Sequence, residues 1–170
     1  MFARLGLDKQ LFYQFNKQLK TLNLIVGKGT IVDATIKQAQ ANPPQSKRDN
    51  DADFTSKRGK TYYGYKGNIA TDEYSEVIKT VKFTKACLHD LNAFEQLVDY
   101  SEQAVFADKG YANKKRRKKP QANGIFDGIL TKGCRNKTLS QSEKKFNKLL
   151  STVRNKVVGI HPYGKDHLHI

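Results

Sequence analysis

Two apolar stretches of the chain each contain a single aspartate, and this pattern limits the structures that the chain can adopt. "TIVDATI" at 30–36 has Asp33 in its middle, and "AVFAD" at 104–108 ends in Asp108. Both stretches are typical of buried β-strands, where a carboxylate without a partner costs several kcal/mol. A divalent cation would compensate both acids, because magnesium usually binds one or two protein carboxylates. Taken singly, each aspartate is equally well explained as a turn or cap residue.

Apolar residues at helical spacing alternate along the chain with short β-branched runs. The expected order is a helix at 8–22, a strand at 31–37, a mobile loop at 40–60, strands at 61–72 and 75–85, a helix at 89–101, strands at 103–111 and 124–132 separated by a short basic helix, and a helix at 140–158. Ser140 and Glu143 form the expected capping box of the last helix. Three strands joined by short turns indicate an antiparallel meander, and the later strand–helix–strand step indicates parallel additions. The sequence thus predicts a mixed α/β sheet flanked by helices, with the strands of Asp33 and Asp108 as central neighbours.

Positive charge is concentrated in the second part of the chain. The formal net charge is +15; residues 1–108 carry 15 Lys and Arg against 13 Asp and Glu, a net of +2, and residues 109–170 carry 16 against 3, a net of +13. The run "KKRRKK" at 114–119 lies in this part. A solvated basic face would explain the excess, but the asymmetry favours a polyanionic partner such as nucleic acid.

The chain has no sequence feature of a membrane or secreted protein. No stretch approaches the ~20 apolar residues of a spanning helix, and the start "MFARLGLDKQ" has no signal-peptide core. Cys87 and Cys134 lie far apart and outside any CxxC pattern, so a disulfide framework and a zinc ribbon are both unsupported. The expected compartment is the cytoplasm.

Four ordered motifs resemble the catalytic domain of the IS5 group of bacterial insertion-sequence transposases. They are "NLIVGKGTIVDATI", "DADFTSKRGKTYYGYKGNIATD", "VKFTKACLHD" and "AVFADKGY", and the likeness runs from about Phe12 to Lys156. The resemblance implies an RNase H-like fold, an Asp–Asp–Glu triad that binds two Mg²⁺ or Mn²⁺ ions, and DNA cleavage and strand transfer. In this pattern Asp33 would bridge the two ions and Asp108 would hold one of them.

The resemblance also implies double-stranded DNA, both transposon ends and target, as the partner. The residues expected to contact DNA are Lys66, Lys114, Lys115, Arg116, Arg117, Lys118, Lys119, Arg154 and Lys165. Lys66 could instead orient an acid or face solvent. His89 and Asp90 match a family position near the active site, but a cap or turn role is the favoured interpretation for them. A homodimer is one of the assembly states that the sequence leaves open.

The third acid of the triad is missing from the sequence. The family pattern on the last helix is Arg, three residues, Glu, six residues, Lys; here Arg154 and Lys165 have this spacing, but Val158 stands at the Glu position. The alternative register places Ile160 there. We therefore expect a truncated or decayed copy that binds DNA, and Mg²⁺ weakly, but cleaves poorly. The alternative is a non-catalytic basic DNA-binding protein.

The expected organisation has three parts. Residues 1–26 would be the remnant of a longer N-terminal region, residues 27–158 the catalytic domain with its loop at 40–60, and residues 159–170 a disordered tail. The tail holds His161, His167 and His169, but no cysteine pair supports a zinc site there.

Overall fold

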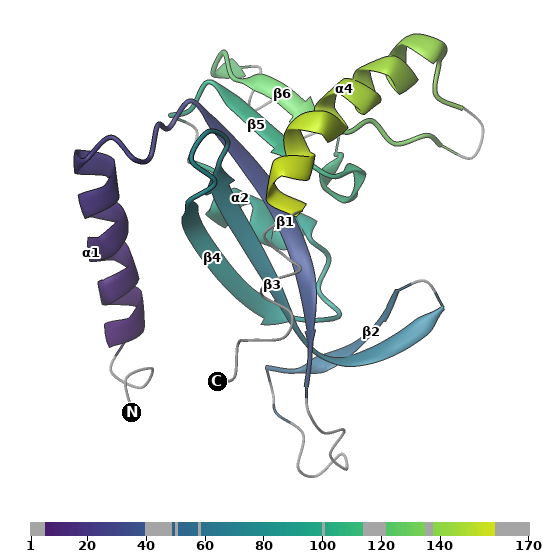
Figure 1. Cartoon of the computed structure of the whole chain (residues 1–170). Helices are drawn as coiled ribbons and strands as arrows, with labels where there is room; N and C mark the ends of the chain where they lie inside the picture. Colours follow the sequence, from purple (N-terminus) through teal and green to yellow (C-terminus); the bar gives the residue numbers. More distant parts are fainter. Residues whose placement is uncertain are drawn as a thin grey trace.

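The computed structural model describes residues 6–39, 49, 51–57, 59–99, 101–113, 122–134 and 138–158, with side chains as far as position 155. The elements, in chain order, are α1 (Leu7–Thr21), β1 (Gly29–Gln38), β2 (Asp53–Lys57), β3 (Lys60–Asp72), β4 (Ile78–Lys85), α2 (Leu91–Leu97), β5 (Ala104–Ala107), the 3-10 turn η3 (Lys109–Tyr111), β6 (Phe126–Ile129) and α4 (Gln141–Val158). Figure 1 shows a central twisted sheet with α2 and α4 packed on it and α1 standing beside it. No helix among these residues is long and apolar enough to cross a membrane.

The strands form one mixed sheet in the order β2-β3-β1-β5-β6, with β4 also paired to β3. The β1–β3 and β3–β4 pairs are antiparallel, whereas β5 pairs parallel with β1 and β6 pairs parallel with β5. The predicted meander and the predicted parallel additions are therefore both confirmed. This mixed α/β architecture agrees with the RNase H-like fold that the resemblance implies.

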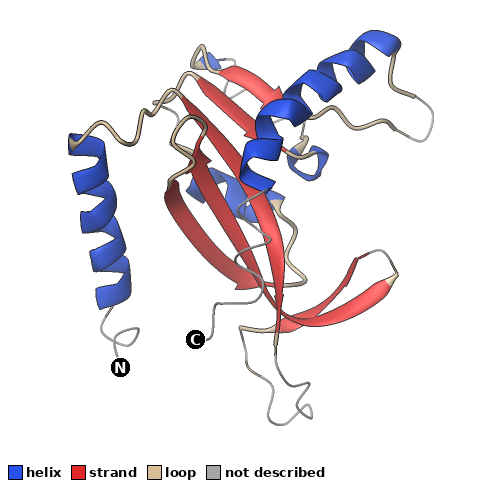
Figure 2. Cartoon of the chain, viewed as in Figure 1, coloured by secondary structure: helices blue, strands red, loops and turns tan. Residues whose placement is uncertain are grey.

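The prediction of a loop over residues 40–60 is wrong in its second half. Residues Asp53–Lys57 form β2, which pairs antiparallel with the first part of β3 to make a hairpin that extends beyond the rest of the sheet (Figure 2). The ring of Phe54 packs against that of Tyr63 at 5.0 Å between centroids, and Gly59 has the positive φ of 76° that a tight turn requires. Because residues 40–60 are mostly polar, the sequence did not indicate this aromatic pair across the two strands, which stabilises the hairpin.

Four other elements are shorter than predicted, among them the strands expected at 75–85 and 124–132, which are Ile78–Lys85 and Phe126–Ile129. The helix expected at 89–101 is limited to Leu91–Leu97, because Val98 is already extended. The strand expected at 103–111 ends at Ala107, and a 3-10 turn follows directly. In these last two elements the chain turns earlier than its apolar residues suggest. Val98 is buried just beyond the end of α2, and Tyr111 is buried within η3.

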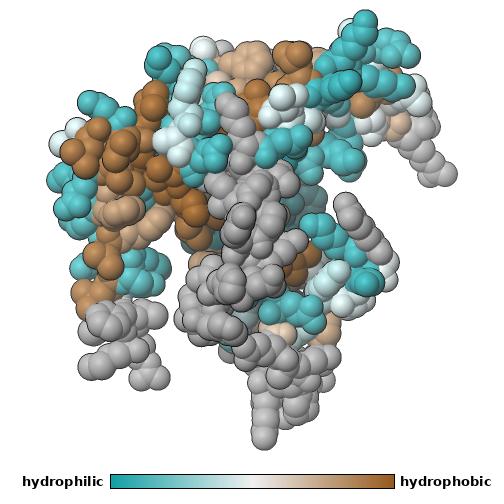
Figure 3. Space-filling model, viewed as in Figure 1, coloured by the Kyte–Doolittle hydropathy of each residue, from teal (hydrophilic) through white to brown (hydrophobic). Residues whose placement is uncertain are grey.

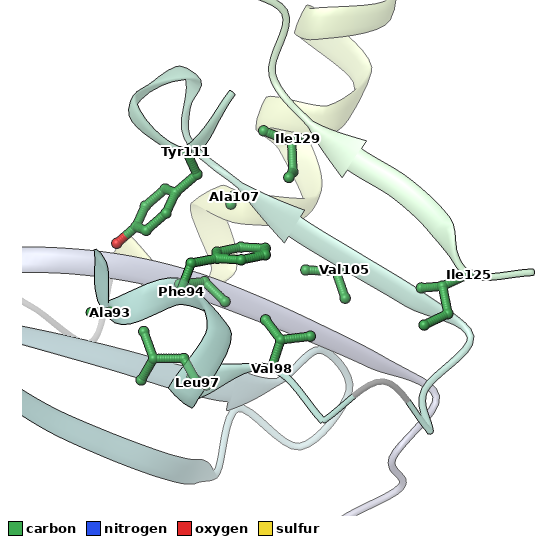
Figure 4. Packing of buried hydrophobic residues seen from close by; sticks show 11 residues of the cluster. Ala93, Phe94, Leu97, Val98, Val105, Ala107, Tyr111, Ile125 and Ile129 are labelled. Carbon is green, nitrogen blue, oxygen red and sulfur yellow. The ribbon is translucent and has the colours of Figure 1, made fainter. Parts of the chain in front are cut away.

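The two faces of the sheet are covered by different helices. On one face, Ile31 of β1 and Phe106 of β5 pack against Leu150 of α4. On the other face, the neighbouring residues in each strand belong to a larger cluster that includes α2; its members are Val32, Ala70, Ala93, Phe94, Leu97, Val98, Val105, Ala107, Tyr111, Ile125 and Ile129 (Figure 4). Because successive strand residues point to opposite faces, an apolar run can serve both clusters.

Helix α1 confirms the helix expected at 8–22, but its apolar side remains largely exposed. Leu11 is 73% exposed and Phe15 is 55% exposed, and no residue of α1 is buried. Asn16 contacts the sheet by donating a hydrogen bond to the Lys79 carbonyl of β4 at 3.3 Å. Figure 3 shows the hydrophobic surface over α1 at the left of the molecule. The core of this protein therefore forms without α1.

The fully buried Asp72 fixes the segment that leads into β1. Its Oδ1 accepts a hydrogen bond from the Gly27 backbone N–H at 2.7 Å, and its Oδ2 accepts from the backbone N–H and the hydroxyl of Ser75, each at 3.1 Å. Burial raises the pKa of this carboxyl, but the hydrogen bonds and the nearby Lys79 outweigh burial and leave the pKa below its usual value of 3.8. These contacts hold the start of β1 and the turn after β3 together.

Candidate active site

The sheet register brings Asp33 and Asp108 together. In the parallel β1–β5 pair, Val32 lies opposite Ala107, so each aspartate is the next residue along its own strand. Alternation along each strand places them on the face of Ile31 and Phe106, which is the face covered by α4. The proximity that the sequence left to topology is therefore present, beside the end of β5 and the middle of β1.

Arg154 of α4 lies between the two carboxylates. Its Nη2 is 3.6 Å from Asp33 Oδ1, and its Nη1 is 3.6 Å from Asp108 Oδ1. The Arg154 side chain is 12% exposed and that of Asp33 is 20% exposed, whereas that of Asp108 is 45% exposed. The site is thus closed by the helix on one side and open to solvent at Asp108.

Helix α4 is held over this site by its packing and by two polar contacts. At its start, the Ser140 N–H donates to Glu143 Oε2 at 2.7 Å and the Glu143 N–H donates to Ser140 Oγ at 3.2 Å, which confirms the predicted capping box. Further along, the Asn147 amide binds both backbone groups of Thr131: Oδ1 accepts from the N–H at 2.9 Å, and Nδ2 donates to the carbonyl at 3.0 Å. These bonds tie the helix to the segment that follows β6.

Asp108 also has the local role that the sequence left open for it. Its Oδ1 accepts a hydrogen bond from the Lys109 N–H at 2.7 Å, so it caps the 3-10 turn η3. The capping bond holds the carboxylate at the strand end beside Arg154. The cap and a ligand role are therefore compatible, because the cap orients a group that is nearly half exposed.

Two carboxylates at one point fit a single hydrated divalent cation. Magnesium commonly binds one or two protein carboxylates and keeps water or phosphate oxygens at its other positions. Within the residues described, no group of three or more His, Cys, Asp or Glu side chains is placed to hold a metal. Glu143 does not supply the third acid, because it caps the start of α4, about three turns of helix before Arg154.

Lys66 lies apart from this pair. Since Asp33 pairs with Ile69, whereas Lys66 pairs with Ile36, strand alternation places Lys66 on the opposite face of the sheet. Its Nζ is 2.8 Å from Asp90 Oδ1 and donates to the Leu88 carbonyl at 2.5 Å. Of the interpretations open for Lys66, the geometry matches the one in which it orients an acid.

Asp90 and Tyr111 are two residues near the site whose surroundings the sequence did not predict. Asp90 stands at the N-cap of α2 without a side-chain capping bond, and it lines, with Lys66 and Lys57, a cavity of about 230 Å³ beside β1. Burial, together with Asp90, Asp33 and Asp108, raises the pKa of the Tyr111 hydroxyl. In the sequence, the motif "HD" at 89–90 draws attention to Asp90, but no local pattern indicates that Tyr111 is buried.

Most of the other residues expected to bind DNA lie outside the part of the chain that the structure describes. Lys114, Lys115, Arg116, Arg117, Lys118, Lys119 and Lys165 lie outside the described residues, as does the tail at 159–170. Position 158 is the last residue of α4, one helical turn after Arg154. Cys87 and Cys134 are both exposed and free.

A comparison with known protein families gives a match over most of the chain. Residues 26–157 match the family model of the transposase DDE domain. The chain belongs to this family. The matched residues contain Asp33, Asp108 and Arg154 and all six strands of the sheet. No solved structure matches the chain significantly.

Membership of the DDE transposase family supports a transposase-type function for the chain. Such domains act on DNA and generally use divalent metal ions. The carboxylates of Asp33 and Asp108 offer oxygen ligands of the kind that such ions prefer. The IS5-group assignment is a finer statement than the family match carries.

Proposed function

We propose that this DDE domain binds DNA ends and supports metal-dependent cleavage and strand transfer through Asp33 and Asp108. The observation that carries the proposal is the convergence of the two carboxylates, one from the middle of β1 and one from the end of β5, on one guanidinium. When bound, divalent cations would activate the attacking water or 3′-hydroxyl and neutralise charge on the scissile phosphate. Among acids of the apolar strands, these two share one face and reach solvent through Asp108.

In this proposal Asp33 is the inner ligand and Asp108 the outer one. Asp33 lies within β1 and is 20% exposed, and its backbone is fixed by pairing with Ile69 of β3. Asp108 is more exposed and is oriented by its bond to the Lys109 N–H. DNA would approach from the Asp108 side, because this carboxylate is the more exposed of the two.

We further propose that Val158 leaves the site one ligand short and that cleavage by this chain is slow. The family pattern places Glu four residues after Arg154, and residues i and i+4 share one face of a helix. A carboxylate at position 158 would therefore project from the same face of α4 as Arg154. Its absence leaves two acids where the resemblance implies three.

Two sets of variants test the proposal in a gel assay with labelled DNA and Mg²⁺ or Mn²⁺. Replacing Asp33 and Asp108 together by alanine should leave salt-sensitive DNA binding in place and remove any metal-dependent nicking. Val158→Glu should raise the cleavage rate on the order of tenfold or more. Losing a group that only supports a metal ligand already costs about tenfold or more in activity, and a ligand itself should matter at least as much. Val158→Gln is the matched control, because it has the same length without the charge.

The alternative is a basic DNA-binding module without chemistry, which the net charge of +15 favours. In that case neither the double alanine variant nor Val158→Glu would change the DNA products, and all proteins would bind DNA with the same salt dependence. Full cleavage by the unmodified chain would instead show that a third ligand comes from elsewhere.

The free cysteines agree with a reducing cytoplasm as the proposed location.

A further inference from the structure

The position of Arg154 carries a conclusion about how the metal site is regulated. The guanidinium stands between Asp33 and Asp108, which is the place where a cation shared by the two carboxylates would have to lie. Two carboxylates at one point repel each other, and a side chain as buried as Arg154 needs opposite charge beside it. In the protein without metal, each partner therefore compensates the other.

The contacts of Arg154 are electrostatic rather than closely hydrogen-bonded. Both nitrogen–oxygen distances are 3.6 Å, longer than the 2.7–3.2 Å of a good N–H···O bond. The Nε of Arg154 is buried and has no acceptor among the described residues. A bidentate arginine–carboxylate pair with short parallel bonds would be far harder to separate. This guanidinium is held in place by charge, but it is not locked there by geometry.

We propose that Arg154 is the built-in counter-cation of the Asp33–Asp108 pair and that it vacates this position when a divalent cation binds. The inference rests on the proposed function, since it takes the two aspartates as the metal ligands. Mg²⁺ binds oxygen at about 2.0–2.1 Å, and an ion held by both carboxylates would compete with the guanidinium for the two oxygens that it faces. Arg154 is thus a positioning residue that keeps the acids together and lowers their affinity for metal.

Removing Arg154 should therefore strengthen metal binding. In Arg154→Gln the two carboxylates lose the positive charge of this guanidinium, and a divalent cation no longer has to displace it. We expect Mn²⁺ to bind Arg154→Gln roughly tenfold more tightly than the unmodified protein, within the range usual for coupled sites. Arg154→Lys keeps the charge and should restore affinity close to that of the unmodified chain.

The measurement is calorimetric titration of Mn²⁺ into the full chain without DNA, supported by the Mn²⁺ resonance spectrum. Lys148→Gln is the matched control, since it removes one exposed positive charge from the same helix and should leave affinity unchanged. Equal or weaker binding by Arg154→Gln would overturn the inference and leave the proposed function standing. Absence of Mn²⁺ binding in every protein, like that expected of an Asp33→Asn and Asp108→Asn double variant, would overturn both.

A second measurement needs no substitution, and it applies even where Arg154→Gln does not fold. The Nε–H signal of Arg154 in a nitrogen-15 spectrum of the unmodified chain should shift with Mg²⁺ in proportion to the bound fraction, because the guanidinium leaves the carboxylates. A signal that stays fixed while the metal site fills would overturn the inference.

Discussion

Asp33 and Asp108 occupy equivalent positions along two parallel strands, because Val32 and Ala107 before them are paired in register. They differ in what holds them. Asp33 continues within β1, whereas Asp108 ends β5 and caps the turn that follows it. Their shared neighbour, Arg154, comes from the other end of the chain. This difference allows the ligand role of Asp108 to be separated from its structural one.

Asp108→Asn should keep the fold and lose the proposed metal ligand. Asparagine caps as well as aspartate, so Asp108→Asn keeps the capping bond and loses only the charge beside Arg154. Asp108→Ala loses the cap and should cost about 1 kcal/mol. Urea denaturation measures both, and Mn²⁺ titration should show that both variants bind metal less well. Equal stability of the two variants would show that the capping bond contributes little.

Asn147→Ala should destabilise the protein by about 2 kcal/mol. The substitution removes two hydrogen bonds, each worth about 1 kcal/mol, and leaves the N–H and the carbonyl of Thr131 without this partner. Lys148→Ala, at the exposed next position of α4, is the control and should have little effect. Because Asn147 ties α4 to the sheet side of the molecule, the arginine signal described above should also broaden in Asn147→Ala. If Asn147→Ala lowered the free energy of unfolding no more than Lys148→Ala does, packing alone would be holding α4 in place.

Asp72→Asn should lower stability at neutral pH and matter less in acid. The folded-state pKa of Asp72 lies below its usual value of 3.8, so the folded protein binds fewer protons than the unfolded chain between the two values. The stabilisation is therefore complete above pH 3.8 and is lost as the pH falls through the folded-state pKa. We expect a loss of about 1–3 kcal/mol at pH 7.

The check is urea denaturation of both proteins from pH 7 to pH 3, with the exposed Asp51→Asn as the control. The difference between Asp72→Asn and the unmodified protein should shrink at the acid end. A difference that does not change with pH would show that the charge of Asp72 is not what stabilises the turn.

The exposed apolar side of α1 should be dispensable for folding, unlike the core. Leu11 and Phe15 are largely exposed, whereas Phe94 is fully buried between α2 and the sheet (Figure 4). Leu11→Ser and Phe15→Ser should each change the free energy of unfolding by no more than about 0.5 kcal/mol, also when they are combined. Phe94→Ala should cost about 3–5 kcal/mol. A large loss on changing α1 would indicate that its apolar face is buried in solution.

The elements of the site could largely be predicted from local sequence. A strand shows its period of two residues and a helix its period of 3.6, and a capping box is recognisable from two residues alone. For this reason "TIVDATI", "AVFAD" and the helix from Ser140 were recognised, and the meander followed from the short turns between strands. The β2 hairpin was missed because its stabilising contact, Phe54 against Tyr63, joins two strands and leaves no periodic pattern within either.

The sequence by itself determined which residues are strand, helix and cap, and that two aspartates stand on apolar strands, because these properties depend on neighbours along the chain. Only the tertiary structure decided that Arg154 lies between those aspartates and that Lys66 turns to Asp90 on the other face. Both outcomes depend on where helices come to rest, and that is set by packing of residues such as Leu150 on Ile31 and Phe106. Contacts of this kind join distant segments, and their free energy is not encoded in any local pattern.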